Sequence, residues 1–259
     1  MTVDDAPPVF APRTPPESLA SQVFQLLRSA IHTGALDPGT IYSIAQVAEQ
    51  LEVSRSPVRE ALLRMAETGI VRIVRNRGFV VVRPHPREIA EIFAVRLALE
   101  VAAVERVSRV ANPELGARLR LAISESHGAA TRGDEEEFFR HDFLMHDGIL
   151  AAAGNDRARR IVAELRETIR ILGPYTAGQT RSLADIEREH EPIVAAIEAG
   201  QTLPAQEAMR AHLTHTALLL IQQACAVHGA GESGIGEGDV AAARAIWADV
   251  LGWGIGLIS

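Results

Sequence analysis

The sequence is poor in several residue types, and each scarcity excludes a class of protein. Its single cysteine, Cys225, rules out a disulfide framework and a thiolate-bound metal cluster. Such cysteine usage is typical of a reducing compartment, so we expect a cytoplasmic protein. No apolar run reaches the ~18 residues that a membrane span needs, and the longest, 216–227, is interrupted by Gln222 and Gln223. We therefore expect no membrane partner.

Lysine is absent altogether, so arginine carries all of the side-chain positive charge apart from histidine. The chain as a whole is acidic, with a formal net charge of -7, which gives no sign of nucleic-acid binding. The arginines are unevenly spread, however. Seven lie between Arg55 and Arg83, against only two acidic residues, Glu60 and Glu67. A local basic patch on an acidic protein is typical of a nucleic-acid-binding module.

The N-terminal part of the chain predicts a small DNA-binding fold. Residues 1–17 are acidic and rich in proline, without the basic and apolar segments of a signal peptide, and we expect a disordered arm. Residues 18–83 show three stretches of helical periodicity, followed by two short β-branched runs joined by a turn at 75–78. This order predicts a winged helix-turn-helix. We expect Ser43 to cap the second helix and Ser56 to cap the third.

Beyond Pro84 and Pro86 the pattern is helical almost throughout, and aromatic residues, only 4% of the chain, are too few to favour a large sheet. We therefore predict a mainly α protein, with an all-α helical bundle over 87–228. Residues 229–259 are expected to form a flexible linker and a C-terminal extension with one short helix. The predicted helices of the bundle are 87–110, 113–131, 135–153, 156–172, 183–199 and 204–227.

The start of the third helix has the pattern of a recognition helix. Arg55 and Arg59 are four residues apart and so share a face, away from the apolar stripe that would anchor the helix. Arginine can pair with two acceptors of guanine, and serine can bind phosphates or base edges. The alternative is a solvated basic face. We expect contacts to double-stranded operator DNA from the helix start and from the hairpin turn: Ser54, Arg55, Ser56, Arg59, Arg75, Arg77 and Gly78.

A possible metal site lies in the predicted bundle. Asp142 and His146 are four residues apart, which places them on one face of a helix. Such a pair alone is more often a hydrogen-bonded core pair than a metal site. His190 and His212, however, lie on the apolar faces of two further helices, where an imidazole without a partner is unfavourable. Four nitrogen and oxygen ligands suit a divalent metal, namely Zn, Ni, Mn or Fe.

Two parts of the sequence resemble a known family. "VAEQLEVSRSPVREALLRMAETGIVRIVRNRGFVV" is similar to the DNA-binding domain of the GntR family of bacterial transcription regulators, over about 19–83. "HDFLMHDGILAAAGN" and "EHEPIVAAIEAGQTLPAQEAMRAHL" resemble the all-helical effector domain of its FadR-like branch, over about 87–228. The resemblance implies operator contacts from Ser54, Arg55, Ser56 and Arg59, with Gly78 at the wing tip. It also implies one divalent metal on Asp142, His146, His190 and His212, and homodimers on a palindromic operator.

These observations predict a transcription regulator, in the first instance a repressor, and not an enzyme. A small organic acid is expected to bind at the metal and to change operator affinity. Arg96 is a candidate to bind the carboxylate of this effector, and the alternative is a helical ion pair with Glu100. Two other functions remain open at this point. One is a constitutive DNA-binding protein with a structural metal, and the other is a metal-dependent hydrolase.

Overall fold

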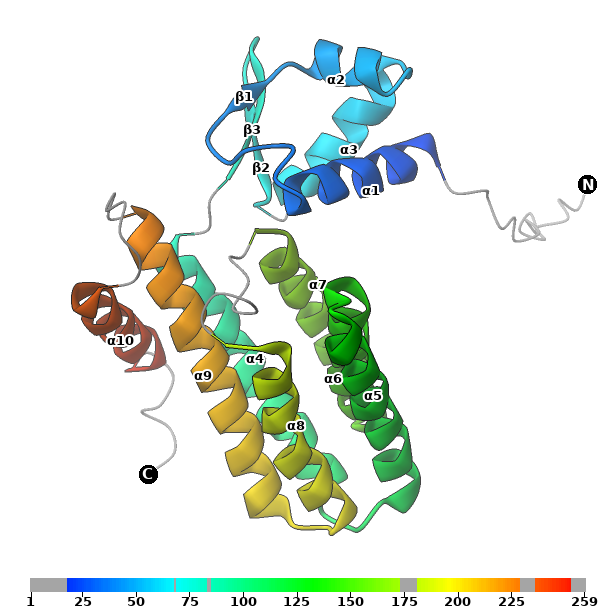
Figure 1. Cartoon of the computed structure of the whole chain (residues 1–259), viewed down its shortest axis with the longest axis vertical. Helices are drawn as coiled ribbons and strands as arrows, with labels where there is room; N and C mark the ends of the chain where they lie inside the picture. The colour runs from blue at the N-terminus through cyan, green and yellow to red at the C-terminus, as the bar shows by residue number, and fades with distance from the viewer. Residues whose placement is uncertain (1–17, 68, 83–84, 173–180, 229–235, 253–259) are drawn as a thin grey trace, which may run out of the picture. The chain divides into compact units, whose positions relative to one another are not determined.

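The computed structural model describes residues 18–67, 69–82, 85–172, 181–228 and 236–252 (Figure 1). The chain divides into two compact units, Met1–Val82 and Arg83–Ser259, which are described separately below. The mainly α fold is confirmed. The predicted N-terminal arm and, within the predicted linker and extension over 229–259, residues 229–235 and 253–259 lie outside the described residues. Among the described residues, no helix is both long and apolar enough to cross a membrane.

The first unit is the predicted winged helix-turn-helix, with one strand that the sequence pattern did not indicate. That strand, β1, has two residues, too few for a periodicity to show, and it pairs antiparallel with β3 in a sheet of order β1-β3-β2. The predicted anchoring stripe of the third helix is fully buried: Val58, Ala61, Leu62 and Met65. In chain order the elements are α1 (Leu19–His32), β1 (Ile41–Tyr42), α2 (Ile44–Gln50), α3 (Arg55–Glu67), β2 (Val71–Val74) and β3 (Gly78–Val81).

Two predicted helix caps differ from the structure. Ser43 is the N-cap residue of α2, but its side chain makes no capping hydrogen bond. Helix α3 begins at Arg55, so Ser56 lies inside the first turn instead of capping it. Pro57 still fits, because the first four N–H groups of a helix have no partner within it and the missing N–H costs nothing there. Ser56 is therefore exposed on the first turn beside Arg55.

Gly78 is required by the contact between two strands. Its φ is +131°, and a Cβ atom there would lie 1.9 Å from the carbonyl oxygen of Tyr42 in β1. Gly39 is a matched control, since its φ is +87° but no atom lies within 4 Å of the added Cβ. We expect Gly39→Ala to destabilise the first unit by about 1 kcal/mol through backbone strain, and Gly78→Ala by about 3 kcal/mol or more through strain and overlap. Urea unfolding of both variants tests this, and equal losses would contradict it.

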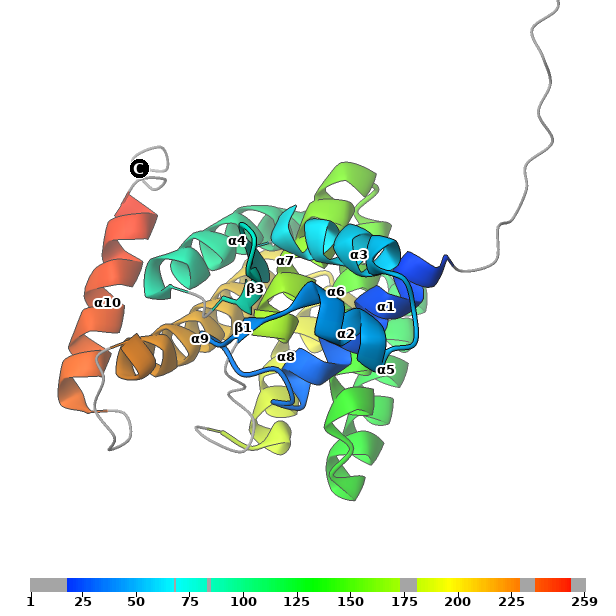
Figure 2. The same cartoon turned by 90° about the horizontal axis from the view of Figure 1, so that it is seen from above.

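The described residues of the second unit form a bundle of seven helices (Figures 1 and 2). The predicted helices of the bundle are all present, with ends shifted by three residues or fewer. Asn112, Asp134 and Ser182 are the N-cap residues of their helices, and each side chain accepts a backbone hydrogen bond there. Such residues are preferred at this position, which explains why the sequence predicts the starts of these helices well. The helices are α4 (Pro86–Val107), α5 (Pro113–Arg132), α6 (Glu135–Ala152), α7 (Asp156–Leu172), α8 (Leu183–Glu198), α9 (Thr202–His228) and α10 (Glu237–Gly252).

The C-terminal extension contributes α10 to this bundle. The helix packs on α4 and α9 and lies beside α9 in both views (Figures 1 and 2). Ala243 and Trp247 are buried in the same apolar core as the other helices. Asp249 also forms an ion pair with Arg87 in the first turn of α4, at 2.7 Å. Helix α10 of the extension thus covers part of α4 and α9 and belongs to the bundle.

Candidate functional site

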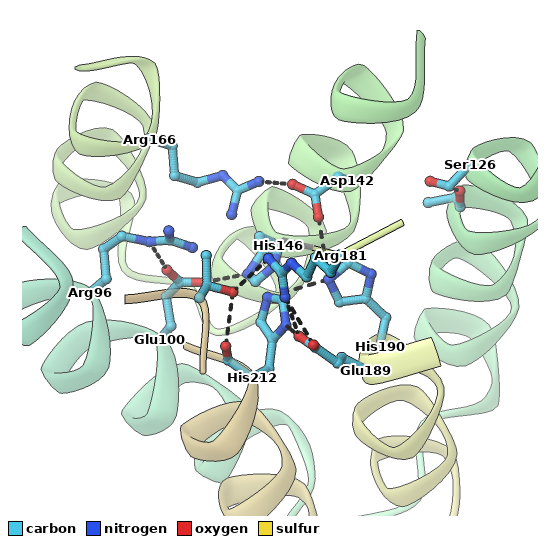
Figure 3. Close-up of polar contacts among 12 residues, drawn as sticks. Arg96, Glu100, Ser126, Asp142, His146, Arg166, Arg181, Glu189, His190 and His212 are labelled. Carbon is cyan, nitrogen blue, oxygen red and sulfur yellow. Dashed lines mark hydrogen bonds and ion pairs between the residues drawn. The ribbon is translucent and has the colours of Figure 1, made fainter. Parts of the chain in front are cut away.

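Three imidazoles from three helices meet inside the second unit (Figure 3). His146 of α6, His190 of α8 and His212 of α9 have exposed fractions of only 0%, 2% and 5%. The Nε2 atoms of His190 and His212 are 3.4 Å apart. One ring nitrogen from each of the three residues lies within 4.8 Å of the others, a spacing that one metal ion could bridge. The sequence placed these side chains on buried helix faces, and the fold brings them together.

Asp142, the fourth predicted ligand, lies at the edge of this cluster. One carboxylate oxygen is 3.2 Å from Nε2 of His190, and the other accepts a hydrogen bond from the guanidinium of Arg166. Nε2 of His146 is buried and has no hydrogen-bond partner. A buried polar atom without a partner is unfavourable, and a metal ion would satisfy it. The three imidazoles, with a carboxylate oxygen of Asp142 beside one of them, therefore fit a divalent cation with nitrogen and oxygen ligands.

Two carboxylates that the sequence did not indicate as partners of the histidines orient the imidazoles. Nδ1 of His146 is hydrogen-bonded to Glu100 of α4, and Nδ1 of His212 lies 2.8 Å from Glu189 of α8. Metal-binding histidines usually donate the second ring N–H to a carboxylate, which fixes the tautomer and turns the other nitrogen toward the metal. Here that arrangement leaves Nε2 of both residues facing the centre of the cluster.

Arg96 forms the ion pair that was the alternative to effector binding. Its Nε donates to Glu100 at 2.7 Å, and the two side chains are only 5% and 1% exposed. The pair does not use the whole guanidinium, because Nη2 of Arg96 is buried without a hydrogen-bond partner. The same holds for Nε of Arg166, whose Nη2 binds Asp142. Two guanidinium groups thus each keep one unused buried donor close to the imidazoles.

The electrostatics of the cluster favour the protonation states that bind a cation. Burial alone would raise the pKa of Glu100, but Arg96 and His146 hold it well below its usual range. In the same way, Arg166 and the imidazoles outweigh burial and depress the pKa of Asp142. Burial and the charge of Arg166 lower the pKa of His146 to about 4. At neutral pH the site therefore combines charged carboxylates with a neutral His146.

A further histidine, His215, lies near the cluster but does not belong to it. His215, one turn from His212, has a side chain that is 54% exposed, and its Nδ1 lies 2.7 Å from Glu189. Glu189 thus connects a buried imidazole to an exposed one. It also lines an open pocket of about 580 Å³. The other residues around this pocket are Arg181, Asp185, Arg188 and His215.

The predicted DNA-contacting residues lie on the surface of the first unit. Ser54 precedes α3, and Arg55, Ser56 and Arg59 lie in its first five residues, all exposed. Arg75 and Arg77 are exposed in the turn between β2 and β3. Gly78 is the first residue of β3, where the close approach of Tyr42 already accounts for a glycine. Arg55 and Arg59 lie outside the buried stripe of α3 and are exposed, which leaves them available to a ligand.

Comparison with known proteins gives a family match for each of the two units. Residues 19–81 match the family described as bacterial regulatory proteins, gntR family, and residues 91–215 match the FCD domain. The gluconate operon transcriptional repressor of Bacillus licheniformis is 33% identical over 177 residues, which cover 66% of this chain and 72% of the relative. The HTH-type transcriptional repressor RspR of Escherichia coli is 25% identical over 199 residues, covering 77% and 87%.

A solved structure, E. coli McbR/YncC, has the same fold. It is 25% identical and aligns with a TM-score of 0.64 over 80% of this chain and 98% of the other. The proteins that the chain resembles are transcription regulators and not enzymes, so the hydrolase alternative has no support. The chain belongs to the GntR family of bacterial DNA-binding transcription regulators, in the FadR-like branch with an FCD domain at the C-terminal side.

Proposed function

We propose that the protein is a homodimeric repressor whose affinity for operator DNA is controlled by a small carboxylic acid bound at a divalent metal. The observation that carries this proposal is the buried cluster of His146, His190 and His212 beside Asp142, with Nε2 of His146 lacking any partner. The metal, one of Zn, Ni, Mn or Fe, would supply a Lewis-acidic position for a carboxylate oxygen. Repression is proposed because two relatives are named repressors.

The protein's own residues provide the rest of the effector site. Arg96 offers its unused Nη2 to the carboxylate while its Nε stays on Glu100. Both residues lie on α4, which begins at Pro86, only four residues after Val82 ends the DNA-binding unit. An effector that binds more tightly to one conformer, with α4 in one of two positions, would therefore act through the helix that follows the DNA-binding unit directly in the chain. The size of the response is set by the difference in effector affinity between the two conformers.

On the DNA side, we assign the contacts to the exposed residues of the first unit. Arg55 and Arg59 would enter the major groove with α3, while Ser54 and Ser56 bind phosphates or base edges near the helix start. Arg75 and Arg77 would contact the backbone or the minor groove from the turn before Gly78. A homodimer would present two such units to the halves of a palindromic operator.

The test is a titration of the metal-loaded protein on an operator selected by the protein from random DNA. We expect at least one small organic acid to weaken operator binding by about tenfold or more, the usual scale of allosteric coupling. His190→Ala should abolish the response to the acid, because one metal ligand is lost. Operator affinity that ignores every acid but collapses on chelation would instead identify the metal as purely structural.

A further inference from the structure

Two arginine–carboxylate–histidine chains converge on the imidazole cluster. In the first, Arg96 binds Glu100, and Glu100 binds Nδ1 of His146. In the second, Arg166 binds Asp142, whose other oxygen is 3.2 Å from Nε2 of His190. Each chain thus begins at a guanidinium with one buried unpartnered nitrogen and ends at an imidazole of the cluster. Figure 3 shows both guanidinium groups on the same side of the imidazoles, away from Glu189.

The charges of these chains cancel before any ligand binds. Glu100 and Asp142 carry one negative charge each, and Arg96 and Arg166 carry one positive charge each. The imidazoles are neutral when they bind a metal. The half-buried Glu189 is balanced in turn by Arg181. A divalent cation at the proposed site would therefore add two positive charges that no neighbouring side chain in the described part of the chain compensates. Uncompensated buried charge is strongly unfavourable.

We infer that the effector is a dianion, a small dicarboxylate, and not a monocarboxylate; this rests on the proposed function of the same site. One carboxylate would bind the metal, and the second would accept hydrogen bonds from the unused donors, Nη2 of Arg96 and Nε of Arg166. Together the two carboxylates would supply the two negative charges that compensate the metal. A monocarboxylate would leave one positive charge and at least one buried donor without a partner. Arg166 thereby becomes a specificity-determining residue, a role that the sequence did not indicate.

Succinate and butyrate, which have the same number of carbon atoms, provide the test. Calorimetric titration of the metal-loaded protein is expected to show succinate binding at least about tenfold more tightly than butyrate, the scale of one charge-assisted hydrogen bond. In Arg166→Gln the two acids should bind with similar affinity. Arg166→Lys keeps the positive charge but not the planar guanidinium, so it should retain part of the preference for succinate over butyrate. If Arg166→Gln does not fold, Arg166→Lys is the variant to be measured in its place.

The outcomes separate the inference from the function on which it rests. Butyrate binding as tightly as succinate would overturn the dicarboxylate inference and leave a carboxylate-responsive regulator intact. Inorganic phosphate is a further probe. If it displaces succinate and has the higher affinity of the two, the dicarboxylate inference is overturned in favour of a phosphate ligand. If the metal-loaded protein binds none of these anions, both the inference and the proposed effector fail. Metal affinity, measured by competition with a chromophoric chelator, should stay within about tenfold in Arg166→Gln, because Arg166 touches a ligand and not the metal.

Discussion

Replacing His146 by alanine is expected to lower the affinity for a divalent metal by about 100-fold or more. The expectation follows from the position of its Nε2, which faces the other imidazoles, is fully buried and has no other partner. Loss of a residue that merely supports a metal ligand costs about 10- to 100-fold in affinity, so loss of a ligand should cost at least as much. Competition with a chromophoric chelator, with metal content from elemental analysis, measures the change.

The matched control is His127→Ala. His127 is also paired with a carboxylate, Glu187, at 3.0 Å, but its side chain is 68% exposed on α5. Removing it should leave metal affinity unchanged. A circular dichroism spectrum must accompany the His146 variant, because Glu100 loses a buried partner in it and could weaken the fold. A folded His146→Ala protein with unchanged metal affinity would refute the proposed site.

The sequence was sufficient to single out the four residues of the proposed metal site because each has a local signature. Asp142 and His146 share a helix face by spacing, and His190 and His212 interrupt apolar faces. Glu100 and Arg166 have no such signature. Glu100 has a satisfactory local explanation as the partner of Arg96, and Arg166 lies in α7, whose many charged residues are typical of a solvated helix. Their contacts with His146 and Asp142 cross between helices, so they depend on packing that periodicity does not determine.

The fold shows the same division between local and non-local information. The helix ends follow from caps and from proline and glycine, which act within a few residues, so the predicted bundle needed only small shifts. Strand β1 was missed because two residues carry no periodicity, and it exists only through its pairing with β3. Gly78 illustrates the consequence. Its position in a basic turn suggested a role on DNA, and the structure adds a second reason for the glycine, because a Cβ atom there would overlap the carbonyl oxygen of Tyr42 in β1.

Replacing both Arg55 and Arg59 by alanine is expected to lower operator affinity by about 100-fold, with about tenfold from each substitution. Both side chains are exposed at the start of α3, and neither belongs to the fully buried stripe, which includes Val58 and Leu62 and anchors the helix. The substitutions therefore remove groups that could pair with bases or phosphates without removing core contacts. Fluorescence anisotropy at one fixed salt concentration, with a selected operator fragment, measures the loss.

Two further arginine variants serve as comparisons for this experiment. Arg118→Ala removes an exposed arginine from α5 in the effector unit and should leave operator affinity unchanged, which controls for overall charge. Arg75→Ala should weaken binding to all sequences alike and reduce the salt dependence, as expected for a phosphate contact. If Arg55 reads a base, its loss must also relax sequence preference at one operator position. A uniform loss across sequences would instead place Arg55 on phosphate and shift base recognition to other residues of α3.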